Sequence, residues 1–352
     1  MRQQILTVGS GTFESVALAV FRYQAAFNPV YQAYLSYLSR NSEAVTNLQQ
    51  IPFLPISFFK THQVTTVPPD LALPDAELTI NSPLVFTSSG TTGQTTSRHF
   101  VNDADLYETV SVQTVETMYG PLENRQILAL LPSYLERTNS SLVYMIQQFM
   151  QQSSAPGNGF YLNNLAELTE QLRQSMQYPE RPVLLIGVTF ALLDWAEQHE
   201  LTFLGQHPNL TVMETGGMKG RRVELLREEV HEILMARLGV SAIHSEYGMT
   251  ELLSQGYSTG EGIFWSGPTM RVLLRDLNDP FFIYPDGYGK IGERRTRSRQ
   301  TGGINVIDLA NLDSCSFVET QDLGQYAETS GTFKVIGRFD NSDIRGCSLL
   351  AL

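Results

Sequence analysis

The chain has 352 residues, and its 36 acidic against 24 basic residues give a net charge of −12. Its 42% hydrophobic and 17% charged residues exclude a disordered chain and suffice for a large core. The acidic balance disfavours a general nucleic-acid binder, which needs clustered Lys and Arg. The four arginines between positions 294 and 299 are interpreted as a solvated loop.

Two cysteines, Cys315 and Cys347, exclude a disulfide scaffold and a cysteine-rich zinc site. No HExxH motif occurs, which disfavours a zinc hydrolase. Met1 is followed by no apolar stretch of signal-peptide length, and the longest apolar run, 182–193, is too short for a membrane span. We therefore expect a cytoplasmic protein with no membrane span.

Residues 1–82 are predicted to form a helical segment packed on the main domain. Thr12 can cap a helix whose apolar residues recur every three or four positions, and a second apolar face follows Pro29. The prolines in the stretch 51–60 forbid a central strand, so this stretch is expected to be extended and buried.

Residues 83–260 alternate short β-type runs with helical stretches, which predicts parallel βαβ units in an α/β subdomain. One amphipathic helix is expected to bury a face formed by Val223, Leu226, Val230, Ile233 and Leu234. The expected strands cover 84–86, 127–131, 183–188, 211–214 and 241–247, and the other helices cover 103–118, 139–151 and 189–199.

After residue 260 the helical patterns end. Short β runs divided by Gly, Pro and Asp at 271–274, 304–309, 315–319 and 333–336 predict a smaller β-rich subdomain that covers 261–352 with the C-terminal tail. Cys315 lies inside one of these runs and is expected in the core.

A loop of small hydroxyl residues and glycines, Ser88 to Gly93, follows the predicted strand at 84–86. Such a loop offers backbone N–H groups and hydroxyls that can hold phosphate oxygens. It is not a Walker A loop, because no Gly-Lys-Ser/Thr follows. An exposed Ser/Thr/Gly turn is the alternative.

A second segment, Glu246-Tyr-Gly-Met-Thr-Glu251, ends a predicted strand with an aromatic residue, a glycine, a hydroxyl and a carboxylate. The ring can stack on a base, the hydroxyl can bond a phosphate, and Glu251 can hold Mg²⁺. A strand end with a capped helix start is the alternative.

Two shorter segments add to this pattern. Thr215-Gly-Gly217 lets a planar ring lie against backbone, although a plain turn explains it equally well. Asp322 ends a β run and can accept hydrogen bonds from both ribose hydroxyls, although most Asp-x-Gly turns do not.

In this order the segments resemble the adenylate-forming superfamily of acyl-CoA synthetases, peptide-synthetase adenylation domains and luciferases. The resemblance covers about 83–347. The segments 51–60, 130–137 and 337–347 look more narrowly like the LuxE-type acyl-protein synthetases, close to phenylacetate-CoA ligase-like enzymes. The implied fold is an α/β adenylate-forming large domain with parallel βαβ sheets and a smaller C-terminal β-rich subdomain.

The resemblance implies ATP and Mg²⁺ as cofactors and gives each matched residue a role. The loop would hold the ATP phosphates through Ser88, Ser89, Gly90, Thr91, Thr92 and Gly93. The adenine would lie among Gly216, Gly217 and Tyr247. Thr250 would contact the α-phosphate and Glu251 would bind Mg²⁺. Asp322 would bind the ribose, with Arg338 beside it.

The chain departs from the family pattern in two ways. The phosphate loop continues as Gln94-Thr-Thr-Ser-Arg98 where many relatives have Pro-Lys, so Arg98 or His99 is expected to supply the positive charge. The sequence given ends at Leu352, and we expect no C-terminal lid domain with its catalytic lysine. Either adenylation proceeds without that lysine or an internal cation such as Lys219 serves; a solvated lysine is the alternative.

Cys347 lies in the C-terminal tail, where a thiolate could attack the mixed anhydride and carry the acyl group as a thioester. The LuxE-type likeness agrees with this role. The expected function is therefore ATP-dependent activation of a carboxylic acid, with a fatty or aryl acid expected, followed by transfer to Cys347.

The alternatives are a CoA ligase that uses free CoA and a non-catalytic, lidless nucleotide-binding relative. Expected partners are the acid and a reductase or acyl carrier. The sequence leaves the oligomeric state open, a homo-oligomer included, and does not fix the chain length of the acid.

Overall fold

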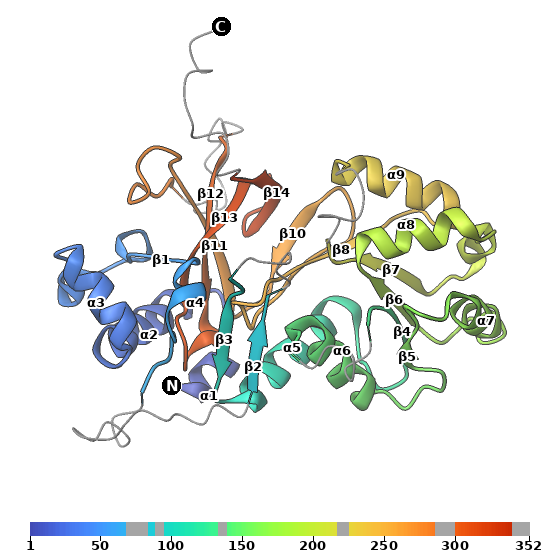
Figure 1. The fold of residues 1–352 in the computed structure, drawn as a ribbon, viewed down its shortest axis with the longest axis horizontal. Coiled ribbons are helices and arrows are strands. Elements are labelled where there is room, and N and C mark those ends of the chain that lie inside the picture. The colour runs from blue at the N-terminus through green and yellow to red at the C-terminus, as the bar shows by residue number, and fades with distance from the viewer. Residues whose placement is uncertain (68–83, 89–94, 133–138, 217–224, 286–299, 340–352) are drawn as a thin grey trace, which may run out of the picture.

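The computed structural model describes residues 1–67, 84–88, 95–132, 139–216, 225–285 and 300–339. Its centre is one 12-stranded sheet, in the strand order β11-β12-β13-β14-β10-β9-β8-β7-β6-β4-β5, with β1 paired to β13. Figure 1 shows the sheet running through the whole molecule, with the N-terminal helices at one end and the α/β units at the other.

Half of the sheet is parallel. It consists of β4 (Gln126–Leu130), β5 (Gly159–Phe160), β6 (Val183–Gly187), β7 (Leu210–Glu214) and β8 (His244–Tyr247). The connecting helices are α5 (Ala104–Tyr119), α6 (Ser141–Gln152), α7 (Leu165–Ser175), α8 (Thr189–Gln198) and α9 (Arg227–Leu238), with a short 3₁₀ turn, η3, at Thr202–Gln206.

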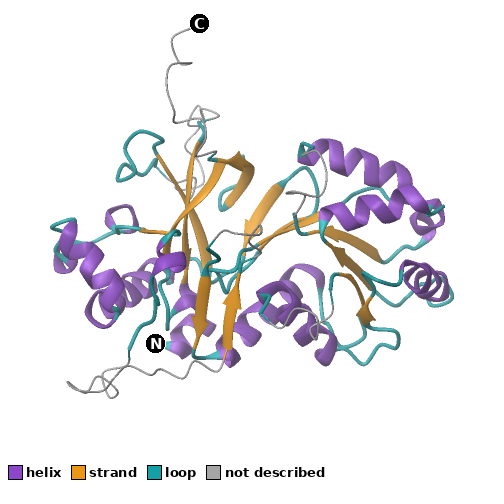
Figure 2. Cartoon of the chain, in the orientation of Figure 1, coloured by secondary structure: helices purple, strands orange, loops and turns teal. Residues whose placement is uncertain are grey.

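Helices cover both faces of this half (Figure 2). Alternate residues of one strand point to opposite faces. Accordingly, Ile127 and Ala129 of β4 pack in one apolar cluster with α5 and α6. Leu128 and Leu130 pack in a second cluster with α7, α8 and α9. Every residue of β4 and β6 is buried, as expected for parallel strands covered on both sides.

The other half is antiparallel. It contains β9 (Gly256–Ser258), β10 (Ile263–Ser266), β11 (Met270–Arg275), β12 (Gly302–Asp308), β13 (Phe317–Tyr326) and β14 (Thr332–Arg338), with a 3₁₀ turn, η4, at Leu309–Asn311. The parallel order therefore ends at β8, which pairs with β9 in the antiparallel sense. A separate hairpin is formed by β2 (Leu84–Thr87) and β3 (Arg98–Val101).

The N-terminal segment packs on β13. It contains α1 (Arg2–Leu6), α2 (Phe13–Phe27), α3 (Pro29–Tyr37), η1 (Ser42–Ala44), η2 (Leu48–Gln50), β1 (Leu54–Pro55) and α4 (Phe58–Thr61). The rings of Phe21 and Tyr31 lie 5.8 and 6.1 Å from that of Phe317 on β13. The Gln24 amide donates to the carbonyls of Asn311 and Leu312. The helices expected after Thr12 and after Pro29 are present as α2 and α3. The stretch 51–55 is extended and largely buried as expected, whereas residues 58–60 belong to α4.

The α/β organisation and the β-rich C-terminal part predicted from the sequence are confirmed. The boundary expected at residue 260 falls between β9 and β10, which pair within the same sheet. The division into 1–82, 83–260 and 261–352 stays a prediction. No helix in the described ranges is long and apolar enough to cross a membrane.

One expectation about a helix is wrong. Leu226 is 67% exposed, because α9 begins at Arg227 and Leu226 occupies the N-cap position. The Leu226 backbone N–H donates to the Glu229 carboxylate, which ties the start of the helix together. Val230 and Leu234 are buried as predicted, and Val223 lies outside the described residues.

Candidate active site

Three of the predicted nucleotide-binding residues meet at the junction of β8, β13 and β14. The Tyr247 hydroxyl donates to Asp322 Oδ2 at 2.9 Å, and Arg338 Nε lies 3.1 Å from Asp322 Oδ1. Asp322 and Arg338 are direct neighbours across β13 and β14, so the sheet itself sets this pair. Burial raises the pKa of Asp322 above its ordinary value, and the positive charge of Arg338 offsets only part of that rise.

Tyr247 is held by aromatic packing as well as by Asp322. Its ring meets those of Phe264 and Phe333 edge-on at 5.9 and 5.6 Å, and those two rings stack on each other at 5.6 Å. Burial raises the pKa of the Tyr247 hydroxyl well above its usual value, so it stays a hydrogen-bond donor at neutral pH. The ring is therefore fixed beside a carboxylate on the antiparallel half of the sheet.

Glu251 is joined to the base of the Ser/Thr/Gly loop. It is buried, and burial raises its pKa, while a hydrogen bond with Ser97 and the charges of Arg338 and Lys60 lower it. Ser97 in turn bonds Ser88 twice, through its N–H to Ser88 Oγ at 2.9 Å and through its carbonyl to the Ser88 N–H at 3.1 Å. The two ends of the loop are thus closed next to the Glu251 carboxylate.

His99 supports the same region but is not a cation. Its Nδ1 lies 2.8 Å from the Thr250 carbonyl, which can only accept, so Nδ1 carries the proton. Burial lowers the pKa of His99 to about 4, and the ring is neutral at pH 7. The expectation that His99 supplies positive charge is wrong for this reason. Arg98 is exposed beside it, with its guanidinium 5.7 Å from the Phe100 ring centroid.

Gly216 is held by a buried carboxylate at the end of β7. Its N–H donates to Glu214 Oε2 at 2.6 Å, and the same oxygen accepts from the Thr189 hydroxyl at 2.8 Å. Its φ of +74° is a conformation that favours glycine. Glu214 and Ser245 are register partners on β7 and β8, so the Gly216 turn lies at the same sheet edge as Tyr247.

Two side chains of α9 stabilise Glu214. Arg227 Nε lies 3.4 Å and His231 Nε2 3.7 Å from its Oε1. Burial alone would raise the pKa of Glu214, but the bond to His231 and the charge of Arg227 outweigh burial and lower the pKa to about 2. Glu214 is therefore ionised at neutral pH and fixes the turn that follows it.

Several expected site residues lie outside the described residues: Ser89, Gly90, Thr91, Thr92, Gly93, Gly217, Lys219 and Cys347. Their roles stay predictions. The described ones form two groups, with Tyr247, Asp322 and Arg338 in the first and Ser88, Thr250 and Glu251 in the second, while Gly216 lies apart from them at the end of β7. The segment 247–251 joins the groups, and the charge of Arg338 reaches both Asp322 and Glu251.

Glu251 suits a magnesium ion in its chemistry. It is a buried carboxylate whose ionised form is favoured by the charges of Arg338 and Lys60, and Mg²⁺ is usually held by one or two carboxylates together with substrate phosphates. No group of three or more His, Cys, Asp or Glu side chains in the described parts of the chain could form a metal site made of protein ligands alone.

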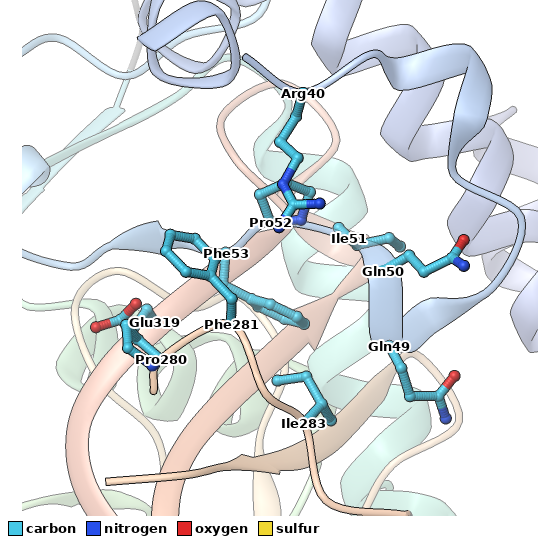
Figure 3. A pocket seen from close by; sticks show the side chains of 10 residues that line it. All are labelled: Arg40, Gln49, Gln50, Ile51, Pro52, Phe53, Pro280, Phe281, Ile283 and Glu319. Atoms are coloured by element: carbon cyan, nitrogen blue, oxygen red, sulfur yellow. The ribbon is translucent and has the colours of Figure 1, made fainter. Parts of the chain in front are cut away.

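A cavity of about 150 Å³ opens elsewhere, between the segment 49–53 and the turn at 280–283 (Figure 3). Glu319 and Arg40 also line it, and the Arg40 guanidinium lies 5.8 Å from the Phe281 ring centroid. None of the expected site residues is among those that line it. This cavity is therefore separate from the candidate active site.

Solved structures show what this architecture is. A 2-hydroxyisobutyryl-CoA ligase in complex with its acyl-adenylate is 12% identical, with a TM-score of 0.62, over 97% of this chain and 71% of that one. Apo MatB from Rhodopseudomonas palustris is 16% identical, with a TM-score of 0.50, over 73% of this chain and 48% of that one. No family model and no curated protein sequence matches the chain.

The chain thus has the adenylate-forming fold. It spans about half the length of MatB and about 71% of the length of the hydroxyisobutyryl-CoA ligase. The likeness therefore establishes the fold of this chain and not the activity of those whole proteins.

Sequence reasoning missed several residues that shape the site. Glu214 directly precedes the predicted Gly-Gly turn, and Ser97 lies four residues after the predicted Ser88–Gly93 loop, so both positions adjoin a predicted motif. Arg227 and His231 act from α9, 11 and 15 residues after Gly216 in the turn that they stabilise. Only the packing of α9 on β7 brings them there.

Proposed function

We propose that this chain activates a carboxylic acid with ATP to form acyl-AMP and pyrophosphate. The observation that carries the proposal is the constellation at the end of β8, where Tyr247, Asp322 and Arg338 are bonded together. A tyrosine ring beside a carboxylate can take a base and a ribose. A buried Glu251 joined to a Ser/Thr/Gly loop can take phosphates and their metal ion.

The chain's residues would divide the reaction as follows. Asp322 accepts hydrogen bonds from the ribose, and the loop N–H groups and Thr250 hold the phosphates. A carboxylate oxygen of the acid attacks the α-phosphorus, and the bond to pyrophosphate breaks. Arg338, Lys60 and Arg98 supply positive charge near the phosphates, which stabilises the charge that develops on them. Mg²⁺ held by Glu251 would neutralise phosphate charge when bound.

Exchange of labelled pyrophosphate into ATP tests this proposal. The exchange should appear only when a suitable carboxylic acid is added, and a broad panel of acids is the appropriate screen. ATP binding without exchange for any acid would instead support the non-catalytic nucleotide-binding alternative.

Cys347 is our proposed acyl acceptor. Its thiolate would attack the acyl carbon of acyl-AMP and release AMP, and the thioester would pass to a reductase or carrier. Cys347→Ser should abolish acyl label on the protein and retain pyrophosphate exchange. Cys315→Ala is the matched control and should retain the label, because Cys315 is buried and its burial raises the thiol pKa to about 12.

Free CoA as acceptor is the second candidate. The two structures above with TM-scores of 0.50 or more include one described as a CoA ligase. A CoA ligase would make acyl-CoA from wild-type and Cys347→Ser protein alike, without a stable acyl label on either. That the substrate is a fatty or aryl acid remains a prediction.

A further inference from the structure

The two faces of β8 differ in how their polar side chains are paired. Ser245 and Tyr247 share one face, where Ser245 Oγ lies 3.2 Å from His231 Nε2 and Tyr247 bonds Asp322. Glu246 points to the opposite face. On that face its direct partner across the β8–β9 pair is Tyr257. Side chains at such opposed positions are neighbours, with Cβ atoms about 5 Å apart.

Two buried polar groups on the Glu246 face, the Tyr257 hydroxyl and Gln255 Oε1, have no hydrogen-bond partner within the described ranges. The half-buried Glu246 lies beside them, and no hydrogen bond joins its carboxyl to a described residue. Tyr257 and Gln255 are only 1% and 3% exposed. An unpaired buried polar group costs about 1–3 kcal/mol, so two in one place are costly unless a further group pairs with them.

These groups lie against the candidate active site. A Cβ at Gly248 would fall 2.3 Å from Glu246 Oε1 and 3.7 Å from Gln255 Cγ, so both side chains flank Gly248. Gly248 lies inside the segment that runs from Tyr247 to Glu251. The polar groups therefore border the point where the acid must meet the nucleotide, on the side of the sheet covered by α5.

The surrounding side chains do not neutralise Glu246. Tyr107 on α5 and Tyr257 on β9 face it, and Glu214 on β7 adds a negative charge. The Tyr107 hydroxyl already donates to the Ser141 carbonyl. Burial and then the charge of Glu214 raise the pKa of Glu246 to about 8, so at pH 7 the carboxyl is mostly neutral and can both donate and accept.

Resting on the proposed function, we propose that Glu246, Gln255 and Tyr257 form a polar subsite that binds a hydroxyl group of the acid substrate. A hydroxyl can donate to Gln255 Oε1 while it accepts from Tyr257 or Glu246. An unsubstituted alkyl tail would leave all three unpaired. The substrate class is therefore a hydroxylated carboxylic acid, which narrows the fatty or aryl acid expected from the sequence.

Pairs of acids that differ only by a hydroxyl test this subsite through pyrophosphate exchange. The probes are butyrate with 3-hydroxybutyrate, phenylacetate with 4-hydroxyphenylacetate, and dodecanoate with 12-hydroxydodecanoate. In at least one pair the wild type should prefer the hydroxylated acid about tenfold or more in kcat/KM, as expected for one hydrogen bond to a buried group.

Glu246→Leu should remove or reverse that preference while KM for ATP stays the same. Tyr257→Phe should weaken the preference and leave the fold intact, because it removes only an unpaired hydroxyl. Ser245→Ala, on the opposite face of the same strand, is the matched control and should keep the preference.

Exchange that favours the plain acid in every pair, or a preference that survives Glu246→Leu and Tyr257→Phe, would overturn the subsite and leave the proposed function standing. Absence of exchange with every acid would overturn the proposed function and the subsite together.

Discussion

Strand β8 presents two faces with opposite properties. On one face, Tyr247 and Ser245 are bonded to Asp322 and His231, and the adjoining Glu214 holds the Gly216 turn. On the other, Glu246 and its cross-strand partner Tyr257 have no hydrogen-bond partner among the described residues. Neighbouring residues of a four-residue strand therefore belong to very different environments.

The two faces therefore suit different roles: side chains on one face position the backbone, and side chains on the other can recognise a ligand. An ionised carboxylate whose one oxygen accepts from the Gly216 N–H and the Thr189 hydroxyl, and whose other oxygen lies near Arg227, fixes the local backbone, as Glu214 does. A carboxyl without a hydrogen bond to the described residues, such as that of Glu246, can form one with a ligand. Under the proposed function, the nucleotide would bind at the bonded face and the variable part of the acid at the other.

Loss of the Glu214 carboxylate should produce the largest effect, a loss of folding stability. Glu214→Gln removes the negative charge next to Arg227 and His231, and breaking such a buried pair costs about 3–5 kcal/mol. The free energy of unfolding, measured with urea at pH 7, should fall by that order. Glu228→Gln on the exposed side of α9 is the control and should change it little.

The stability difference between the wild type and Glu214→Gln should also depend on pH. Because the pKa of Glu214 is about 2 in the fold and 4.5 as the ordinary value, its stabilisation is complete above pH 4.5 and is lost as pH falls towards 2. The wild type should lose its advantage over Glu214→Gln in that window. An advantage that does not change with acidification would contradict the ionised assignment.

Asp322→Ala should have the next largest effect, on nucleotide binding. It removes an acceptor of the Tyr247 hydroxyl and the proposed ribose contact, and hydrogen bonds to charged groups contribute about 1.5–3 kcal/mol each. Calorimetric titration should show ATP affinity reduced roughly 100-fold, which is two factors of about 1.4 kcal/mol.

Tyr247→Phe keeps the ring and should reduce ATP affinity less than Asp322→Ala does. Asp279→Ala on an exposed turn is the control. Unchanged ATP affinity in Asp322→Ala would show that the nucleotide does not bind at this face.

Glu246→Gln should have a smaller effect that depends on pH. The pKa of Glu246 is about 8 in the fold against an ordinary value of 4.5, with Tyr107, Tyr257 and Glu214 facing it. Its contribution to stability is full below pH 4.5 and is lost as pH rises to 8. Between pH 5 and pH 8 the difference in unfolding free energy should therefore shift by about 1 kcal/mol or more in favour of Glu246→Gln.

Paired urea titrations of the wild type and Glu246→Gln at the two pH values measure that shift. A constant difference between them would show that Glu246 is not held neutral by its surroundings.

Arg338→Ala should have the smallest effect, a modest loss of ATP affinity. The Arg338 side chain is 63% exposed, and exposed ion pairs contribute about 0–1 kcal/mol. ATP affinity should fall by no more than about fivefold at low salt, and the difference should shrink as salt is raised. A loss as large as that of Asp322→Ala would mean that Arg338 contacts the nucleotide directly.

The sequence predicted those features that depend on local pattern. The apolar runs gave β4, β6 and β7 to within a residue or two, and the helical spacing gave α5 and α6. The convergence of Tyr247, Asp322 and Arg338 was expected from the resemblance and is present as a bonded group.

Features that depend on long-range burial were not predictable in this way. His99 is neutral because α4 and the Thr250 carbonyl enclose it, with the Phe59 ring 5.6 Å away. Glu246 lies beside Tyr247 in the sequence, but only the packing of α5 over β8 and β9 makes its carboxyl a buried group. Leu226 was assigned to a buried face because the pattern of apolar residues continues past the true start of α9.

The central claim is that the acid's carboxylate attacks the α-phosphorus of ATP. An acid labelled with ¹⁸O in its carboxylate, incubated with ATP and with hydroxylamine as acyl acceptor, tests this directly by mass spectrometry of the products. The account predicts AMP that carries one ¹⁸O atom, because the attacking oxygen stays on phosphorus when the acyl carbon–oxygen bond breaks. AMP without label, or ADP accompanied by labelled inorganic phosphate, would contradict it.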